Sequence, residues 1–263
     1  MRISVTTPTY GRPEKHPLLY RCYAGQNWED KELIVLDDSP MPSDFFTQLD
    51  DPSVRYIHSQ SKQNIGEKRN HLAHLATGEV IAHFDDDDYY GPNYLRFMAE
   101  QLGHAGLVRL AGWFIYSQAQ SRLWYWDQRT IAKPVHYRLM GGQRLDAVPV
   151  ANLSPEDQDT WITDNLGGWG FSFMYPKAAY EKVPFEEVNH GEEGLFTQGI
   201  RKLGYDVVQA VDTEGLAIVI RHAQDNSNLF PQYALPDFLI DQLFEPGVRD
   251  FLEHRSDTPT KTA

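Results

Sequence analysis

Residues 64–92 read NIGEKRNHLAHLATGEVIAHFDDDDYYGP, and this stretch decides the fold. Its first part has apolar residues at helical spacing and predicts a helix with Gly78 as its C-terminal stop. The next part, residues 79–84, predicts a buried strand that runs directly into four consecutive aspartates, Asp85–Asp88. Like charges this close repel, and each loses hydration when it is buried. The run therefore indicates a bound cation, unless it is simply a solvated turn.

The residues before this stretch alternate between apolar strands and polar or helical segments. Strands are expected at residues 3–7, where Pro8 ends the first one, at 33–36 and at 53–59. This alternation is typical of the α/β class with a mainly parallel sheet flanked by helices. Three of the strands end in the polar motifs TPTYGR, DDS and DDDD. Parallel strands would bring these motifs to one sheet edge, where such folds bind their ligands.

The second half of the chain predicts a smaller antiparallel element beside further helices and strands. Its expected strands are 107–117, 122–128, 206–211 and 215–220, and its expected helices are 94–102, 177–183, 192–204 and 237–254, the last one interrupted at Pro246. We expect one domain with a first half at 1–100, a second half at 101–235, and a helical segment with a disordered tail at 236–263.

Composition excludes several classes of protein. A net charge of −13 argues against a nucleic-acid-binding protein, which would need a basic stripe. The single cysteine, Cys22, excludes an internal disulfide. The first residues, MRISVTTPTY, are too short and polar for a signal peptide, and no apolar run approaches the roughly 20 residues of a membrane span. We therefore expect a cytoplasmic protein, either in solution or peripheral to the inner face of the membrane.

The acidic motifs suggest metal and nucleotide chemistry. Carboxylate oxygens are the ligands that Mg²⁺ and Mn²⁺ prefer, and an ion held by one or two carboxylates keeps positions open for phosphates. Asp85–Asp88 would thus hold a metal that carries a diphosphate. Asp37 and Asp38 either cap the end of their strand or accept hydrogen bonds from a base or a ribose.

Other candidate residues also have two interpretations each. Lys68 and Arg69 either contact a phosphate or base or form a solvated helix face. Glu192 and Glu193 open a helix, where the dipole favours acids, or one of them is a general base whose pKa is raised by burial. His222 follows an apolar strand and is either structural or a ligand of a metal or phosphate.

These motifs, in this order, resemble family 2 glycosyltransferases of the GT-A fold. The segments ISVTTPTYGRP, LIVLDDS and NIGEKRNHLAHLATGEVIAHFDDDDYYGPNYL are similar to that family's opening strand, nucleotide-contact strand and D-x-D region. HGEEGLFTQGIRKLGYDV and RHAQDNSN resemble its later acidic helix and its His-containing segment. Residues 110–165 match no motif of the family.

The resemblance implies an inverting glycosyltransferase that uses a nucleotide-sugar, with UDP as the most frequent carrier. It implies that residues 1–100, with the D-x-D motif, bind the nucleotide-sugar and that residues 101–235 bind the acceptor. It implies Mn²⁺ or Mg²⁺ at the metal ligands Asp87, Asp85 and His222, with the D-x-D register open by one residue. It implies Glu193 as the catalytic base, with Glu192 as the reserve. Its expected nucleotide contacts are Pro8, Thr9, Tyr10, Arg12, Asp37, Asp38, Lys68, Arg69, Asp85 and Asp86.

The aromatic residues of the second half offer a sugar platform, because apolar sugar faces stack on indole rings. Trp169 and its neighbour Gly168 are the expected substrate contacts, since glycine lets a ligand approach the backbone. The other tryptophans of this half, Trp113, Trp124 and Trp126, are expected in the core.

Other functions stay open at this stage. The alternatives are a sugar nucleotidyltransferase, a retaining transferase, and a non-catalytic module that binds a nucleotide or a metal. The acceptor could be a carbohydrate, a lipid-linked molecule or a protein. The C-terminal segment 235–254 either packs on the core, docks a membrane enzyme or forms a homodimer.

Overall fold

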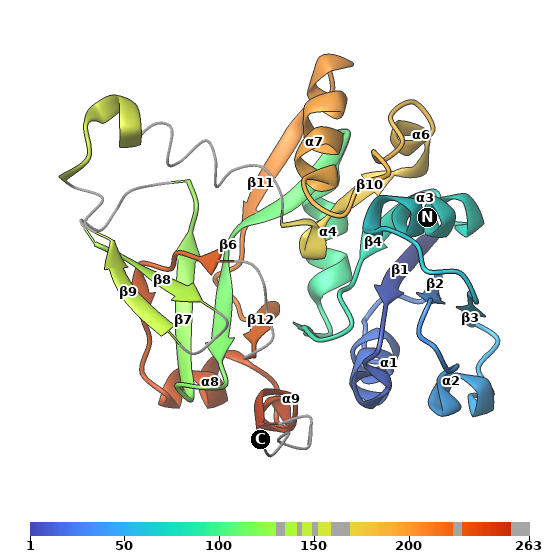
Figure 1. Ribbon diagram of the computed structural model, residues 1–263, viewed down its shortest axis with the longest axis horizontal. Helices are drawn as coiled ribbons and strands as arrows, with labels where there is room; N and C mark the ends of the chain where they lie inside the picture. Colours follow the sequence, from blue (N-terminus) through green and yellow to red (C-terminus); the bar gives the residue numbers. More distant parts are fainter. Residues whose placement is uncertain (130–134, 141–143, 149–151, 159–168, 223–227, 254–263) are drawn as a thin grey trace.

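The computed structural model describes residues 1–129, 135–140, 144–148, 152–158, 169–222 and 228–253 (Figure 1). Its N-terminal half is built on four parallel strands in the order β4-β1-β2-β3. These strands are β1 (Ile3–Thr9), β2 (Lys31–Asp37), β3 (Val54–His58) and β4 (Val80–His83). The residues of β1 and the apolar run Leu33–Leu36 of β2 are buried on both sheet faces, which confirms the predicted parallel sheet.

Strand β1 is longer than its sequence predicted. It continues through Pro8 to Thr9, where the prediction ended it before the proline. The pairing of β1 with its neighbour β4 ends at Thr6. The missing N–H of Pro8 therefore interrupts no backbone hydrogen bonds between these two strands. On the other side, Thr9 lies opposite Asp37 of β2. The polar residues that follow both strands therefore start at the same level.

Helices cover both faces of these strands: α1 (His16–Ala24) packs with Val5 and Leu33, and α3 (Ile65–Leu75) packs with Ile34 and Leu36. A reciprocal capping box between Asn64 and Glu67 begins α3. Two shorter segments, η1 (Pro13–Lys15) and α2 (Asp44–Gln48), lie in the loops between strands.

Helix α3 ends three residues before the predicted stop. Its C-cap is Ala76, so Gly78 does not terminate the helix as predicted. A Cβ atom at Gly78 would lie 2.8 Å from the carbonyl oxygen of Arg2. The glycine instead allows the chain to pass close to the start of β1 on its way into β4.

The second half is organised around the long strand β6 (Leu107–Ser117). It pairs antiparallel with β7 (Arg122–Asp127) and parallel with β11 (Val207–Val211) and β12 (Ala217–Arg221). The short strand β10 (Met174–Pro176) pairs with both β4 and β6 and so joins the two halves into one sheet. The remaining strands of this sheet are β5 (Tyr89–Tyr90) and β14 (Tyr233–Ala234).

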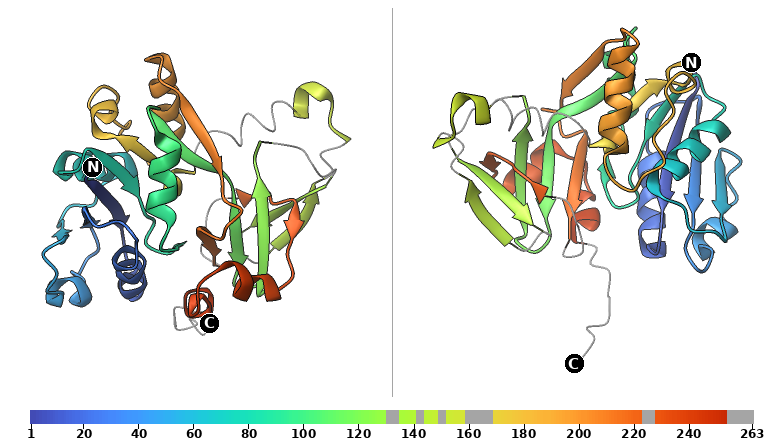
Figure 2. Two further views of the ribbon diagram at one scale, coloured as in Figure 1. Left: turned by 180° about the vertical axis from the view of Figure 1, so that it is seen from behind. Right: turned by 45° about the horizontal axis from the view of Figure 1, so that its top comes forward.

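A smaller antiparallel sheet has the order β13-β8-β9. It consists of β8 (His136–Met140), β9 (Arg144–Val148) and β13 (Asn228–Leu229), and it lies at the end of the molecule opposite β3 (Figures 1 and 2). The remaining helical elements are α4 (Tyr94–Leu102), η3 (Gly170–Ser172), α6 (Lys177–Tyr180) and α7 (Glu192–Lys202). The predicted single α/β domain, mainly parallel with a smaller antiparallel element, is confirmed.

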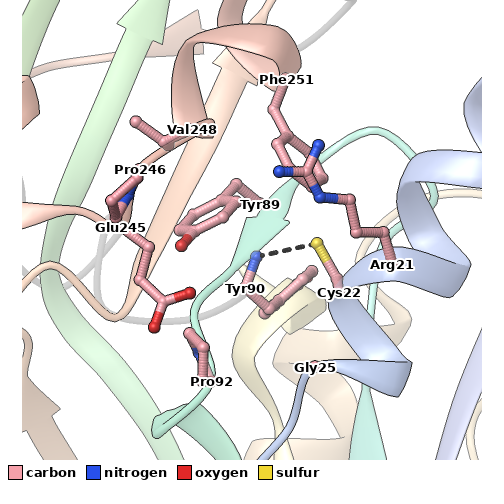
Figure 3. Close-up of a pocket in the computed structure, with 10 residues that line it drawn as sticks. All are labelled: Arg21, Cys22, Gly25, Tyr89, Tyr90, Pro92, Glu245, Pro246, Val248 and Phe251. Atoms are coloured by element: carbon pink, nitrogen blue, oxygen red, sulfur yellow. Dashed lines mark hydrogen bonds between the residues drawn. The ribbon is translucent and has the colours of Figure 1, made fainter.

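The C-terminal segment packs on the core, as one of its three interpretations expected. Its helices are α8 (Phe238–Leu243) and α9 (Val248–Glu253), on either side of the predicted Pro-Gly break. Phe251 of α9 is buried, and the guanidinium of Arg21 on α1 lies 4.8 Å from its ring centroid. Between α1 and α9 is a cavity of about 130 Å³ that contains none of the predicted site residues (Figure 3). No helix within the described residues is both long and apolar enough to cross a membrane.

Candidate active site

The ends of β1, β2 and β4 meet at one edge, as the sequence predicted. Thr9 at the end of β1 donates from Oγ1 to Asp86 Oδ2 over 2.5 Å, although the two residues are 77 positions apart. The backbone N–H of Gly11 donates to Ser39 Oγ over 2.7 Å, which ties the loop after β1 to the loop after β2. The three polar motifs therefore form one continuous site.

The four aspartates alternate in direction. Asp86 and Asp88 are buried, and Asp88 accepts the backbone N–H of Ile220 in β12 over 2.9 Å. Asp85 and Asp87 are partly exposed. The interpretation of this run as a solvated turn is therefore wrong, and two of its carboxylates remain accessible to a ligand.

Asp87 is contacted by an arginine and a histidine. Arg12 Nη1 lies 2.5 Å from Asp87 Oδ2 and 2.9 Å from Asp86 Oδ1. His222 Nε2 lies 2.9 Å from the same Oδ2 atom of Asp87. Burial raises the pKa of Asp87, but the hydrogen bond from His222 and the charge of Arg12 outweigh it and hold that pKa below its usual value.

The pKa values of Asp85 and Asp86, the two neighbours of Asp87 on its N-terminal side, are raised. Burial raises the pKa of Asp85 to about 7; Arg69 opposes this rise, and the charges of Asp87, Glu193 and Asp86 add to it. Burial and the charge of Asp87 raise the pKa of Asp86 to about 6. A bound cation would relieve the repulsion between these carboxylates and lower their pKa values, so the charges of this site favour cation binding.

The two acids after β2 have different partners. Asp37 accepts hydrogen bonds from the Ser39 N–H over 2.8 Å and from the Tyr56 hydroxyl over 2.7 Å, so it caps the strand end. Asp38 forms an ion pair with Lys68, and this lysine also donates to the Thr9 carbonyl over 3.0 Å. The interpretation of Lys68 as part of a solvated face is wrong, because the residue is 6% exposed.

Arg69 lies inside the protein, where it binds acids from a different helix. Its Nη2 donates to Glu193 Oε1 over 2.6 Å, and its Nε donates to Glu192 Oε1 over 3.3 Å. Its Nη1 lies 2.7 Å from His83 Nδ1. Although burial lowers the pKa of Arg69, the charges of Glu193, Asp85 and Glu192 raise it above its usual value. The interpretation of Arg69 as part of a solvated face is wrong as well.

Glu192 and Glu193 both lie in the first turn of α7, but their surroundings differ. The side chain of Glu192 is 5% exposed, and that of Glu193 is 21% exposed. Burial and the charge of Glu193 raise the pKa of Glu192, against the opposing charge of Arg69. Glu193 is thus the acid that a substrate could reach.

Two residues that the sequence analysis did not single out complete this region. His83, the last residue of β4, is buried and accepts from Arg69, and burial holds its pKa well below the usual value. Gly170 lies against the base candidate, because a Cβ atom there would be 2.2 Å from Glu193 Oε1. A histidine at the end of an otherwise apolar strand, two residues before the first aspartate, was the available signal for His83.

The two aromatic residues predicted to contact a ligand lie in different parts of the molecule, Trp169 in the second half and Tyr10 after β1. Trp169 is half-buried, has a left-handed backbone (φ 76°), and lies 5.9 Å from Trp113 and 5.2 Å from Trp126 between ring centroids. Gly168 lies outside the described residues. Tyr10 directly follows the end of β1 and is 44% exposed, and Pro8 within β1 is half-buried. As predicted, Trp113, Trp124 and Trp126 are core residues.

A metal ion would not be held by protein ligands alone. Within the part of the chain that the structure describes, no group of three His, Cys, Asp or Glu side chains could hold one. Asp85, Asp87 and His222 nevertheless supply carboxylate and imidazole donors at the exposed edge. This donor set fits Mn²⁺ or Mg²⁺ with the remaining positions filled by phosphates and water.

Comparisons with known proteins agree with this geometry. The family model described as Glycosyl transferase family 2 matches residues 4–183. A provisionally named colanic acid biosynthesis glycosyl transferase, WcaA of Escherichia coli strain K12, is 32% identical over 97 residues, which are 35% of this chain and 35% of that protein.

Solved structures share the architecture. S. aureus TarS 1–349 in complex with UDP-GlcNAc has a TM-score of 0.54 at 18% identity and covers 86% of this chain and 60% of its own. The mannosyltransferase PcManGT from Pyrobaculum calidifontis, in complex with GDP-Man and Mn²⁺, has a TM-score of 0.55 at 13% identity, with 84% and 56% covered. This chain thus spans less than two thirds of each of these relatives. The predicted GT-A type of α/β fold is confirmed.

Proposed function

Because this chain belongs to glycosyl transferase family 2, we propose that it transfers a sugar from a nucleotide-sugar to an acceptor hydroxyl, with a divalent metal and with inversion at the anomeric carbon. One observation carries the proposal. Glu193, more than 100 positions after the aspartate run, shares the guanidinium of Arg69 with His83, which ends β4 two residues before the run begins. The aspartates proposed to bind the metal and the glutamate proposed to activate the acceptor hydroxyl thus lie in one site.

The metal would be held by Asp87, with Asp85 or His222 as a second ligand. The alternating burial of the four aspartates supports this register, because Asp86 and Asp88 point into the protein and bind Thr9 and Ile220. When bound, Mn²⁺ or Mg²⁺ would stabilise the charge that develops on the departing diphosphate.

Glu193 would act as the catalytic base. Inversion in a single displacement requires a carboxylate that removes the proton of the acceptor hydroxyl as it attacks the sugar. Glu193 is four times as exposed as Glu192, at 21% against 5% of the side chain. The hydrogen bond from Arg69 fixes the position of the Glu193 carboxylate.

Arg69 would therefore position the base, although the sequence predicted a nucleotide contact. Its three nitrogens are directed to Glu193, Glu192 and His83 inside the protein. The nucleotide would instead lie over Tyr10 and near the Lys68–Asp38 pair, at the ends of β1 and β2.

We propose UDP as the donor carrier and a carbohydrate, lipid-linked molecule or protein as the acceptor. Of the proteins with this fold, one is in complex with UDP-GlcNAc and another with GDP-Man. Trp169, which packs against Trp113 and Trp126 and directly precedes Gly170, would contact the sugar or the acceptor.

The test is nucleotide release from UDP- and GDP-sugars in Mn²⁺, Mg²⁺ or EDTA. We expect slow hydrolysis of one donor that needs metal, that Asp87→Ala abolishes and that Glu193→Gln lowers by roughly 10²–10⁴-fold with donor binding intact. The exposed Glu187→Gln is the matched control and should keep full turnover. Formation of a nucleotide-sugar from a nucleoside triphosphate would favour the nucleotidyltransferase alternative. Nucleotide binding without turnover would favour a binding module.

A further inference from the structure

We propose that Arg12 serves as the protein's own cation at the metal position on Asp87, which it bridges to Asp86, and that it is displaced when the divalent metal binds. The inference rests on the proposed function, because it takes the metal site as given. It adds a role for Arg12 that couples metal binding to nucleotide binding.

The contacts of Arg12 place it in competition with a metal. A single nitrogen, Nη1, bridges Asp86 Oδ1 at 2.9 Å and Asp87 Oδ2 at 2.5 Å. The same Oδ2 atom also lies 2.9 Å from His222 Nε2. An ion coordinated by Asp87 and His222 would need the lone pairs that these donors now engage. Metal binding and the Arg12–Asp87 ion pair therefore exclude each other at this oxygen.

Arg12 can leave this position without disrupting the fold. Its side chain is 40% exposed, whereas Asp86 and Asp87 are 5% and 13% exposed. Gly11 before it has φ +69°, and no atom lies within 4 Å of where its Cβ would be. After Arg12 leaves, Asp86 keeps the 2.5 Å hydrogen bond from Thr9. The exposed side chain of Arg12 can therefore move toward solvent while Asp86 keeps a hydrogen-bond donor.

A displaced Arg12 has a natural second partner. It follows Tyr10 in the loop that leads from β1 to the exposed edge, where the nucleotide is proposed to lie. A guanidinium binds a diphosphate in the same bidentate manner as it binds carboxylates. The metal would release Arg12 from the aspartates, and the phosphates would then bind it. Because such coupling is reciprocal, the nucleotide should raise metal affinity by the same factor as the metal raises nucleotide affinity.

The test measures Mn²⁺ affinity by the electron paramagnetic resonance signal of free Mn²⁺, with and without UDP, and does not depend on turnover. Without nucleotide, Arg12→Gln should bind Mn²⁺ about tenfold more tightly than the wild type, because a charge-assisted contact no longer competes. With UDP, the increase in Mn²⁺ affinity should be several-fold smaller in Arg12→Gln than in the wild type.

Lys62→Gln is the matched control. Lys62 is exposed and lies 4.3 Å from the Tyr10 ring centroid, so its removal takes one positive charge from the same loop region without touching the aspartates. It should leave Mn²⁺ affinity without nucleotide within about twofold. Equal Mn²⁺ affinity in the wild type and Arg12→Gln would overturn this inference and leave the proposed function standing. Absence of Mn²⁺ binding in both proteins, with and without UDP, would overturn the metal site and this inference together.

Discussion

Arg69 on α3 and Glu193 on α7 are joined by a 2.6 Å hydrogen bond between Nη2 and Oε1, across 124 positions of the chain. The arginine is 4% exposed, so the bond lies at the boundary between the core and the site. It fixes the more exposed acid of α7 relative to the helix that also carries Lys68. The geometry of the proposed base is therefore set by the N-terminal half of the molecule.

Replacing Arg69 by lysine should lower kcat by roughly 100-fold and change the Kd for UDP and Mn²⁺ by less than about threefold. A lysine retains the charge but cannot bind Glu193, Glu192 and His83 simultaneously, and a displacement of about 1 Å at a reacting group is enough for a loss of this size. Initial rates and equilibrium titration of the same variant give the two quantities.

The matched control for Arg69→Lys is Arg55→Lys on β3, where the arginine is exposed, and it should change neither quantity. If Arg69→Lys instead weakens UDP binding and leaves kcat unchanged, Arg69 contacts the nucleotide, as its sequence pattern suggested. Comparison of kcat with Kd therefore distinguishes a positioning residue from a donor contact.

Gly170→Ala should lower turnover by roughly 100-fold and leave Mn²⁺ and UDP affinity unchanged. The new Cβ would lie 2.2 Å from Glu193 Oε1 and 2.6 Å from its Cδ, so the carboxylate has to move away from Arg69. Gly194→Ala tests the same change one residue after the base, where a Cβ meets no atom within 4 Å. This second variant should keep its turnover and gain about 1 kcal/mol of helix stability.

Full turnover in Gly170→Ala would show that the Glu193 carboxylate adopts another position during catalysis. A crystal structure of that variant would locate the displaced side chain. A parallel loss of turnover in both glycine variants would point to α7 as a whole rather than to the contact between Gly170 and Glu193.

The position of the site could be predicted from the sequence, because it depends on the residues that directly follow each strand. Continuous apolar runs predict parallel strands, and the residue after each run must lie at the shared edge. From the sequence alone, this argument predicts correctly that the strand ends carrying Thr9, Asp38 and Asp85 lie at one edge of the sheet. Such an argument needs only strand direction and order, which the alternation of strands and helices determines.

The sequence could not predict which charged residues face inward. Arg69 lies four residues after Ile65 and three before Leu72, so helical spacing placed it on the apolar stripe of α3, but a positive charge favoured the surface instead. Its partners come from β4 and α7, far away in the sequence. Burial of such a charge depends on long-range pairing, which spacing does not encode.

The effects of replacing Lys68 and Asp38 on the free energy of unfolding should be strongly coupled. Their side chains are 8% and 0% exposed, so removing either partner leaves a buried charge without compensation. Lys68→Met alone should lower the free energy of unfolding by about 3–5 kcal/mol. The double variant Lys68→Met with Asp38→Asn should recover about 1–3 kcal/mol of the summed losses, as measured by urea unfolding. Strictly additive losses would show that the pair contributes nothing beyond its separate contacts.

His16 should make the protein less stable in acid. The imidazole is 1% exposed, with Nδ1 2.8 Å from Ser43 Oγ and Nε2 3.2 Å from Thr9 Oγ1. Burial lowers its pKa below 6.5, against the opposing charges of Asp37 and Glu14. The unfolded chain therefore binds a proton that the folded protein excludes, so the free energy of unfolding falls as the pH drops below 6.5. At pH 5.5 this contribution reaches up to about 1.4 kcal/mol.

Urea unfolding of the wild type and His16→Gln between pH 8 and pH 5.5 measures this contribution directly. Glutamine can bond to Ser43 and Thr9 without titrating, so the stability difference between the two proteins should shift in favour of the variant by up to about 1.4 kcal/mol as the pH falls. His104→Gln, a change at an exposed histidine, is the control and should track the wild type across the range. Parallel stability curves for His16→Gln and the wild type would mean that His16 takes up a proton without leaving the folded state, and that the loop between β1 and α1 opens to water in acid.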